Sequence, residues 1–379
     1  MKATPIYLDY NATTPCDPRV VEAMLPYFTQ HFGNAASADH VYGWQSREAV
    51  TDARLQVAEL IGASPKQIIF TSGATESINL ALKGLAENSP GGHIISCQTE
   101  HKAVLDTLTY LEMRGCDVTL LEVDTDGALS PAALEAAIRP NTIAIALMYA
   151  NNETGVIHPV PEFAAIARRH DIPFLCDATQ AVGKIPVNVT SDGPDLMAFS
   201  AHKIYGPKGI GALYIRSKRQ LLQPLLHGGA HEGGLRSGTL NTPGIIGFGK
   251  AAELCQAELS DEQQRLGMLR DQLEAALLGQ LPGVVINGKG SRLPQVSNVL
   301  LPHPDVEHLL LSLSAHLAVS RGSACANLVQ QPSHVLKAMG LSVEQAAQAV
   351  RISLGRFTTA TEVQQAAQRL VQAIATPVV

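Results

Sequence analysis

The chain has 379 residues, of which 46% are apolar and 16% charged; this composition excludes an intrinsically disordered chain or a coiled coil. At roughly 150 residues per domain, the length allows two or three domains. The 34 acidic and 28 basic residues give a net charge of −6, so we expect no general nucleic-acid-binding surface and no surface for anionic membranes.

The N-terminus lacks the apolar region of a secretory signal, and the longest apolar run, residues 143–150, is too short to cross a membrane. The six cysteines are scattered and show no metal-ligand spacing, so neither a structural metal site nor a disulfide framework is expected. We therefore expect a cytoplasmic protein with reduced cysteines.

Short apolar segments alternate with helical patterns between about residues 45 and 260. Buried strands are predicted at residues 67–71, 93–97, 118–123, 142–148, 173–177, 196–200 and 211–215. Amphipathic helices are predicted between them, at residues 76–85, 102–113, 131–138 and 161–169. This alternation predicts an α/β fold with a mainly parallel sheet covered on both faces.

The pattern changes after about residue 260. The segments predicted there are a long helix at 260–278, strands at 284–286 and 296–301, and helices at 306–314, 343–350 and 361–374. They indicate a smaller α+β domain that shares its layer with the N-terminal arm. We therefore expect a large domain at residues 16–258 and a small domain formed by residues 1–15 and 259–379.

Three of the predicted strands end in polar residues, at the sheet edge where open parallel sheets bind ligands. Residues 71–76 form a strand end, a glycine turn and a helix start, which is typical of a phosphate site but also of a simple helix cap. Asp177 closes an apolar strand and is either a buried anion or a helix cap. Lys203, among apolar and glycine residues, is either a desolvated amine or a surface charge. Together the three positions match what pyridoxal phosphate requires.

Two further residues stand out in the C-terminal part. Cys325 lies among small residues and is the one thiol placed for reactivity, whereas Cys97 and Cys176 lie inside apolar strands and are expected to be inert. Arg351 lies in an apolar strand and needs an anionic partner. That partner is either a substrate carboxylate or an internal salt bridge, and the sequence leaves both open.

With these motifs assembled, the chain resembles the pyridoxal-phosphate-dependent cysteine desulfurases of the class V aminotransferase family, in particular the nitrogen-fixation and housekeeping iron–sulfur group. The resemblance runs from about Tyr7 to Phe357. Its landmarks are the segments 8–15, 32–34, 71–76, 100–102, 151–155, 177–180, 202–203, 236–239 and 322–325. It implies a fold-type-I α/β structure that binds pyridoxal 5′-phosphate in the large domain.

The resemblance also assigns roles around the cofactor. Lys203 is expected to form the Schiff base and to carry the substrate α-proton, Asp177 to pair with the ring nitrogen, and His101 to stack on the ring. The further cofactor contacts it implies are Gln180 on the phenolic oxygen, Asn152 nearby, Ala74, Thr75, Ser200 and His202 on the phosphate, and Thr239 on the phosphate of the other subunit. These roles imply a homodimer and no metal.

For the substrate, the resemblance places Asn152 and Arg351 on the carboxylate, with Asn34 nearby. The implied reaction converts L-cysteine to L-alanine and leaves a persulfide on Cys325. A sulfur-acceptor protein, either an iron–sulfur scaffold or a thiolation enzyme, then receives the sulfur. No contact with nucleic acid or membrane is expected.

The chain departs from the family pattern at Arg321, where a small residue is common, and at Gly233, where an arginine is common. Because Arg321 lies four positions before Cys325, we expect it to favour the thiolate. Alternatives are another class V or fold-type-I aminotransferase, a selenocysteine lyase, and a non-catalytic sulfur-transfer scaffold. A metal site at His227, His231 and Glu232 is disfavoured because these residues lack a recurrent helical ligand pattern.

Overall fold

Seven strands form the central sheet of the computed structural model, which describes residues 4–217, 222–321 and 332–375. In chain order they are β2 (Ile68–Thr71), β3 (His93–Cys97), β4 (Asp117–Leu121), β5 (Thr142–Met148), β6 (Phe174–Asp177), β7 (Leu196–Ser200) and β8 (Gly211–Ile215). Their order across the sheet is β2-β8-β7-β6-β5-β3-β4, and only β8 runs antiparallel to its neighbours. The mainly parallel sheet predicted from the sequence is thus confirmed.

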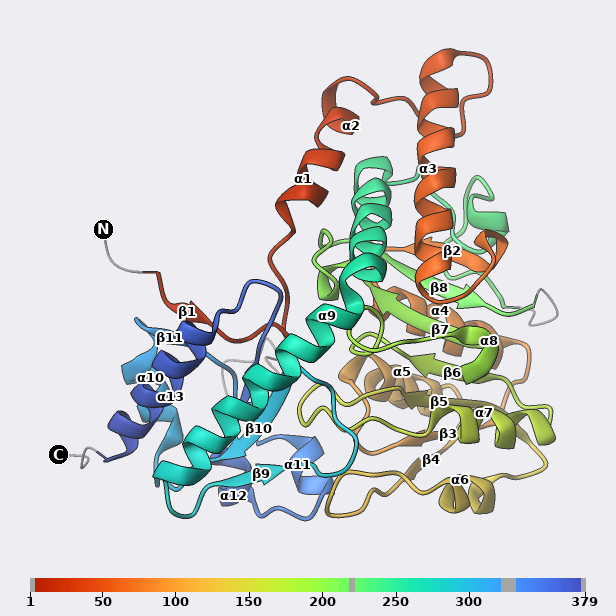
Figure 1. The fold of residues 1–379 in the computed structure, drawn as a ribbon. Helices are drawn as coiled ribbons and strands as arrows, with labels where there is room; N and C mark the ends of the chain where they lie inside the picture. Colours follow the sequence, from red (N-terminus) through yellow and green to blue (C-terminus); the bar gives the residue numbers. More distant parts are fainter. Residues whose placement is uncertain (1–3, 218–221, 322–331, 376–379) are drawn as a thin grey trace.

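Helices cover both faces of this sheet, and the strand residues alternate between them (Figure 1). One face packs on α4 (Ala74–Glu87) and α5 (Lys102–Met113), which share a core with Ile94 of β3. The other face packs on α7 (Val160–Arg169), which shares a core with Ile95 of β3. The shorter connecting elements are η1 (Pro65–Gln67), α6 (Pro131–Ala137), α8 (Val189–Asp192), η2 (Ala201–Lys203) and η3 (Glu232–Gly234).

A single helix of 39 residues, α9 (Thr242–Gln280), runs from the central sheet to the second sheet (Figure 1). The helix was predicted to begin at residue 260, which is wrong by 18 residues. Its first half lacks an amphipathic pattern because it is buried between several helices, namely α1 (Pro18–Met24), α2 (Pro26–Thr29) and α3 (Val41–Leu60). At Gly249 an added Cβ would lie 2.6 Å from the Cα of Ala53, so glycine permits this close approach.

The second sheet is antiparallel and has the order β12-β10-β9. Its strands are β9 (Val285–Asn287), β10 (Val296–Leu300) and β12 (Ala349–Ser353), and the helices around it are α10 (Val306–Leu313), α11 (His334–Ala338), α12 (Val343–Ala347) and α13 (Ala360–Ala375). The helix predicted at 343–350 is wrong at its end, because residues 349–353 pair with β10 as a buried strand.

The N-terminal arm joins this second layer. Strand β1 (Ile6–Tyr7) pairs in parallel with β11 (Leu317–Ala318), and Asp9 bridges to Ser353. Helix α9 continues through residue 258 without a break. The domain division expected at that residue stays a prediction. Within the described ranges, no helix combines the length and the apolar character that a bilayer span requires.

Candidate active site

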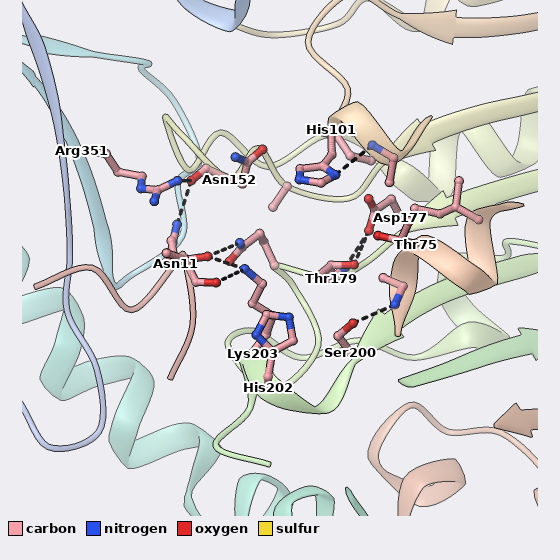
Figure 2. A pocket seen from close by; sticks show the side chains of 17 residues that line it. Asn11, Thr75, His101, Asn152, Asp177, Thr179, Ser200, His202, Lys203 and Arg351 are labelled. Carbon is pink, nitrogen blue, oxygen red and sulfur yellow. Dashed lines mark hydrogen bonds between the residues drawn. The ribbon is translucent and has the colours of Figure 1, made fainter. Parts of the chain in front are cut away.

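A cavity of about 290 Å³ lies at the carboxyl ends of β2, β5, β6 and β7, where the N-terminal arm also meets the sheet. The residues expected in the site that line it are Ala74, Thr75, His101, Asn152, Asp177, Gln180, Ser200, His202, Lys203 and Arg351. Figure 2 shows that those labelled in it come from both layers of the fold and point into one space. Ten of the residues expected from the sequence are therefore brought together.

The turn between β2 and α4 forms one wall of the cavity. Gly73 has a φ of 155°, which only glycine adopts without strain, and it brings the amide of Ala74 within 2.7 Å of the Ser200 hydroxyl, which accepts its hydrogen bond. Ala74 and Thr75 open the helix, so their N–H groups lie at its positive end. This wall is suited to an anion such as a phosphate group.

Asp177 lies at the end of β6 and is buried, with 7% of its surface exposed. Its Oδ1 accepts hydrogen bonds from the Thr179 amide (3.0 Å) and the Thr179 hydroxyl (2.5 Å). Neither bond uses Oδ2, which remains available to pair with a cationic group in the cavity. Thr179, which also lines the cavity, had no assigned role in the sequence analysis, although a residue two positions after an aspartate is a common partner of its carboxylate.

Lys203 follows β7 in the short helix η2 and lines the cavity beneath Asp177 (Figure 2). Its Nζ donates hydrogen bonds to the main-chain oxygens of Asn11 (2.5 Å) and Ala12 (2.8 Å). Desolvation, with a further contribution from the nearby Arg351 charge, lowers the pKa of Lys203 to about 8. The amine is therefore far easier to deprotonate than that of a surface lysine, as imine chemistry requires.

Asn11 connects the N-terminal arm to the cavity, a role that the sequence analysis did not assign. Its carbonyl accepts from Gln180 Nε2 (3.0 Å) as well as from Lys203, and its side-chain amide donates to the Asn152 carbonyl (3.0 Å). The main-chain amide of Asn11 donates to the Ser353 hydroxyl (2.9 Å). The only sequence signal for Asn11 was its place in the segment 8–15, because most of these contacts involve main-chain atoms.

His101 caps the N-terminus of α5: its Nδ1 accepts from the Ala103 amide (3.1 Å). An Nδ1 that accepts a hydrogen bond carries no proton, so in the neutral ring the proton is on Nε2. Desolvation inside the cavity lowers the pKa of His101, with Lys203 adding to the effect and Asp177 opposing it. Desolvation and Lys203 also lower the pKa of His202 to about 4, and the Nδ1 of that ring lies 3.1 Å from the Thr13 hydroxyl.

Arg351 is buried in β12 on the side of the cavity opposite Ser200 (Figure 2). It pairs with Asp9 at 2.8 Å and donates to the Asn152 carbonyl at 3.3 Å. The internal salt bridge left open by the sequence analysis therefore exists. The Nε of Arg351 is buried with no hydrogen-bond partner among the described residues, which leaves it capacity for an anionic ligand.

Two expected site residues that the structure describes do not line the cavity. Asn34 lies between α2 and α3, where its Oδ1 accepts from the Ala36 amide (2.9 Å), and Thr239 is exposed before α9. Cys325 lies outside the described residues, so its expected role stays a prediction. Arg321, expected to act on that cysteine, pairs with Glu307 at 3.0 Å. At Gly233 the φ is +67°, a conformation that an arginine would rarely adopt.

A second cavity of about 380 Å³ adjoins the first and shares Thr75, His101 and Ala103 with it. Helices α4 and α5 contribute the remaining wall, which includes Lys83 and Lys102. The two cavities together make an open depression rather than a closed pocket.

Comparison with known proteins identifies similar chains across the whole length. Residues 6–366 match the family described as Aminotransferase class-V. The chain is 52% identical over 363 residues to "Cysteine desulfurase IscS" of Anaeromyxobacter dehalogenans, covering 95% of this chain and 90% of that protein. Its identity to the protein of the same name from Methylococcus capsulatus is 48%, with the same coverage of both chains.

Solved structures agree with these relatives. The structure titled "NIFS-LIKE PROTEIN" matches with a TM-score of 0.91 and 38% identity, covering 98% of this chain and 99% of the other. The structure titled "SspA in complex with cysteine" matches with a TM-score of 0.83 and 39% identity, covering 93% and 99% of the two chains.

Proposed function

This chain belongs to the aminotransferase class-V family, and we propose that it is a pyridoxal-phosphate-dependent cysteine desulfurase that converts L-cysteine to L-alanine and collects the sulfur on Cys325. The observation that carries the proposal is the juxtaposition of Lys203, Asp177 and the turn at residues 73–75 around one cavity. The relatives named cysteine desulfurase support the reaction, and a solved relative in complex with cysteine supports the substrate.

The residues present fit pyridoxal phosphate at three points. An anion site at the start of α4 suits the phosphate, the free Oδ2 of buried Asp177 suits a protonated ring nitrogen, and the Lys203 amine with its lowered pKa suits an aldehyde. When bound, the cofactor supplies the aldehyde carbon for an imine and a ring that withdraws electrons from the substrate.

Lys203 and His101 are the groups we propose for proton transfer. After substrate binding, Nζ of Lys203 takes the proton from the α-carbon of the cysteine, which the amine does readily because its pKa is close to neutral pH. His101 is neutral with its proton on Nε2, so it would be able to donate a proton into the cavity. It is also the residue that would stack on the cofactor ring, as the resemblance implies. Thr179 orients the Asp177 side chain, which we assign to pair with a cationic group of the cofactor at the end of β6.

Arg351 and Asn152 bind the substrate carboxylate in this proposal. Arg351 is held in place by Asp9 and by the Asn152 carbonyl, so its guanidinium group is oriented before the substrate arrives. Its unpartnered Nε provides the additional donor. The two partners considered for Arg351, a substrate carboxylate and an internal salt bridge, are thus compatible, because the salt bridge positions the same guanidinium group that receives the substrate.

Sulfur transfer is assigned to Cys325. Its thiolate attacks the sulfur of the bound cysteine, so that a sulfur–sulfur bond forms and the carbon–sulfur bond breaks. The electron pair stays with the substrate carbon, which takes up a proton to become the methyl group of alanine. The net change is one cysteine and one enzyme thiol giving one alanine and one enzyme persulfide.

We further propose a homodimer in which Thr239 reaches the phosphate of the other subunit, since Thr239 is exposed and does not line the cavity of its own chain. Asn34 also lies outside that cavity, so its substrate contact remains a proposal. We assign the large domain to residues 16–258 and the small domain to residues 1–15 and 259–379. The final sulfur acceptor is an iron–sulfur scaffold or a thiolation enzyme in the cytoplasm.

The test measures alanine and sulfide released from L-cysteine, together with the intact mass of the protein under non-reducing conditions. Wild type is expected to form alanine and to gain sulfur, whereas Cys325→Ala gains none and releases little alanine. Cys255→Ala is the matched control, because that thiol is buried in α9 and has no role in transfer. If Cys325→Ala retains full turnover of cysteine, the assignment is overturned; faster turnover of selenocysteine than of cysteine would identify a lyase for that substrate.

A further inference from the structure

A glycine-rich segment, residues 227–239, contacts the elements on either side of the turn at residues 72–75 from outside the cavity. Its Glu232 is buried and pairs with Arg54 at 2.6 Å, and the other carboxylate oxygen accepts from the Phe70 amide of β2 at 2.8 Å. Four residues later, Arg236 pairs with Glu76 in the first turn of α4 at 2.9 Å. The segment therefore contacts both the strand that leads into the turn and the helix that leaves it.

Glu76 places a negative charge at the start of α4. Its Oε2 accepts a hydrogen bond from the Ser72 amide at 2.7 Å, which closes the turn at residues 72–75. A carboxylate at this end of a helix stabilises the helix. It also occupies the same positive end as the proposed phosphate site, so its charge opposes binding of a phosphate dianion.

Arg236 compensates the negative charge of Glu76. Its Nε bonds to Oε1 of Glu76, and the two side chains are only 23% and 12% exposed, so solvent screens the pair weakly. Although desolvation raises the pKa of Glu76, the hydrogen bonds from Arg236 and Ser72 outweigh it and hold the pKa below its ordinary value. The carboxylate is therefore charged and neutralised by Arg236 at neutral pH.

The cavity itself offers little compensation at this end. Within this chain, the groups facing the proposed phosphate are the Thr75 amide, the Ala74 amide with the Ser200 hydroxyl that accepts from it, and the neutral His202 ring. The threonine proposed above to come from the other subunit adds no charge. One lysine and one arginine line the cavity, and both have other partners. Lys203 donates to main-chain oxygens of the N-terminal arm, and Arg351 pairs with Asp9. The charge of Glu76 is consequently balanced from outside the cavity.

We propose that Arg236 is a positioning residue for the phosphate site: it neutralises Glu76 and holds that carboxylate on the Ser72 amide, so that the turn accepts a dianion. The proposal rests on the proposed function, because it requires that the anion is the phosphate of pyridoxal phosphate. Arg236 does not line the cavity, and it acts through Glu76.

The test compares the affinity of the cofactor-free protein for pyridoxal phosphate and for pyridoxal, which lacks the phosphate. Arg236→Gln is expected to weaken binding of pyridoxal phosphate by about tenfold or more while changing pyridoxal affinity by less than about twofold. Arg236→Lys restores most of the loss, because it keeps the positive charge. The double variant E76Q/R236Q also recovers to within about threefold of wild type, because it removes both charges.

Glu76→Gln alone provides a measurement that does not depend on a weakened variant. It keeps an acceptor for the Ser72 amide and leaves Arg236 positive, so it is expected to bind pyridoxal phosphate about threefold more tightly than wild type. Thermal unfolding of every variant reports folding separately. Equal losses for both ligands in Arg236→Gln would mean a purely structural role, and weak binding by the double variant would also overturn the inference.

These results are separable from failure of the proposed function. If wild type binds no pyridoxal phosphate and releases no alanine from cysteine, the proposed function fails. If wild type does both and Arg236→Gln binds pyridoxal phosphate as tightly as wild type, only the role of Arg236 is rejected.

Discussion

The Nζ of Lys203 lies 2.5 Å from the main-chain oxygen of Asn11, so a residue that follows the central sheet is held by the N-terminal arm. Asn11 in turn contacts Asn152 and Ser353. The lysine position thus depends on the correct docking of the arm and of the second sheet. The site is assembled only when both layers of the fold are in place.

Replacing the lysine removes the proposed attachment and proton-transfer group. We expect Lys203→Ala to lower the rate of alanine formation by about 10³-fold or more and to abolish covalent retention of the cofactor. The rate follows from alanine assays, and reduction with borohydride followed by mass measurement reports the attachment. Lys289→Ala is the control, because that side chain is exposed and does not line the cavity. Equal retention of cofactor in both variants would contradict the role of Lys203.

The lowered pKa of Lys203 makes a prediction for pH. Only the neutral amine attacks an aldehyde, so below pH 8 the rate of cofactor incorporation into the cofactor-free protein rises with pH by about tenfold per unit. Above about pH 8 the rate levels off, whereas an ordinary lysine would level off only near pH 10.4. The absorbance change on mixing with pyridoxal phosphate measures this rate, and an inflection near pH 10 would contradict desolvation of Lys203.

Asp177→Asn tests the charge at the end of β6. An amide of the same size is able to keep the bonds from Thr179 but no longer favours a protonated ring nitrogen, so we expect kcat for alanine formation to fall by about 10²-fold or more. Thr179→Val is the matched variant: it removes the hydroxyl bond and leaves the amide bond, and its kcat should fall by less than about tenfold. A larger loss in Thr179→Val than in Asp177→Asn would show that orientation outweighs charge.

The ion pair between Arg54 and Glu232 makes a prediction for stability. Because Glu232 is 2% exposed at its side chain, Arg54→Met leaves a buried carboxylate without its cation and should lower the free energy of unfolding by about 2–4 kcal/mol. Arg139→Met breaks a pair with Asp117 in which both side chains are about half exposed, and should cost less than about 1 kcal/mol. Urea denaturation of the two variants makes the comparison, and similar losses would rule out a special contribution from burial.

The strands of the central sheet were predictable because buried strands appear in the sequence as short apolar runs between polar turns. Strands β3, β5, β7 and β8 begin and end at the predicted residues. The first half of α9 and the end of α12 were not predictable in the same way. Burial on several sides removes the helical period from residues 242–259, and pairing with β10 converts residues 349–353 into a strand.

The site shows the same division between side-chain chemistry and tertiary arrangement. Lys203, Asp177 and the turn at 73–75 were predictable because each has a chemical character suited to its strand end. The contribution of Asn11 was not, since its main-chain oxygen makes the contacts with Lys203 and Gln180. Asn34 and Thr239 show a further limit: the family motifs assign them to the site, but neither lines the cavity of this chain.

Helix α9 has a mechanical consequence. At 1.5 Å per residue its 39 residues extend about 58 Å along the helix axis, and the helix is packed against both layers. Changing the bend of this helix breaks main-chain hydrogen bonds, so rigid-body rotation of one layer against the other would be recorded as faster amide hydrogen exchange near its midpoint. Uniformly slow exchange along α9 during turnover would mean that the two layers stay fixed while catalysis proceeds.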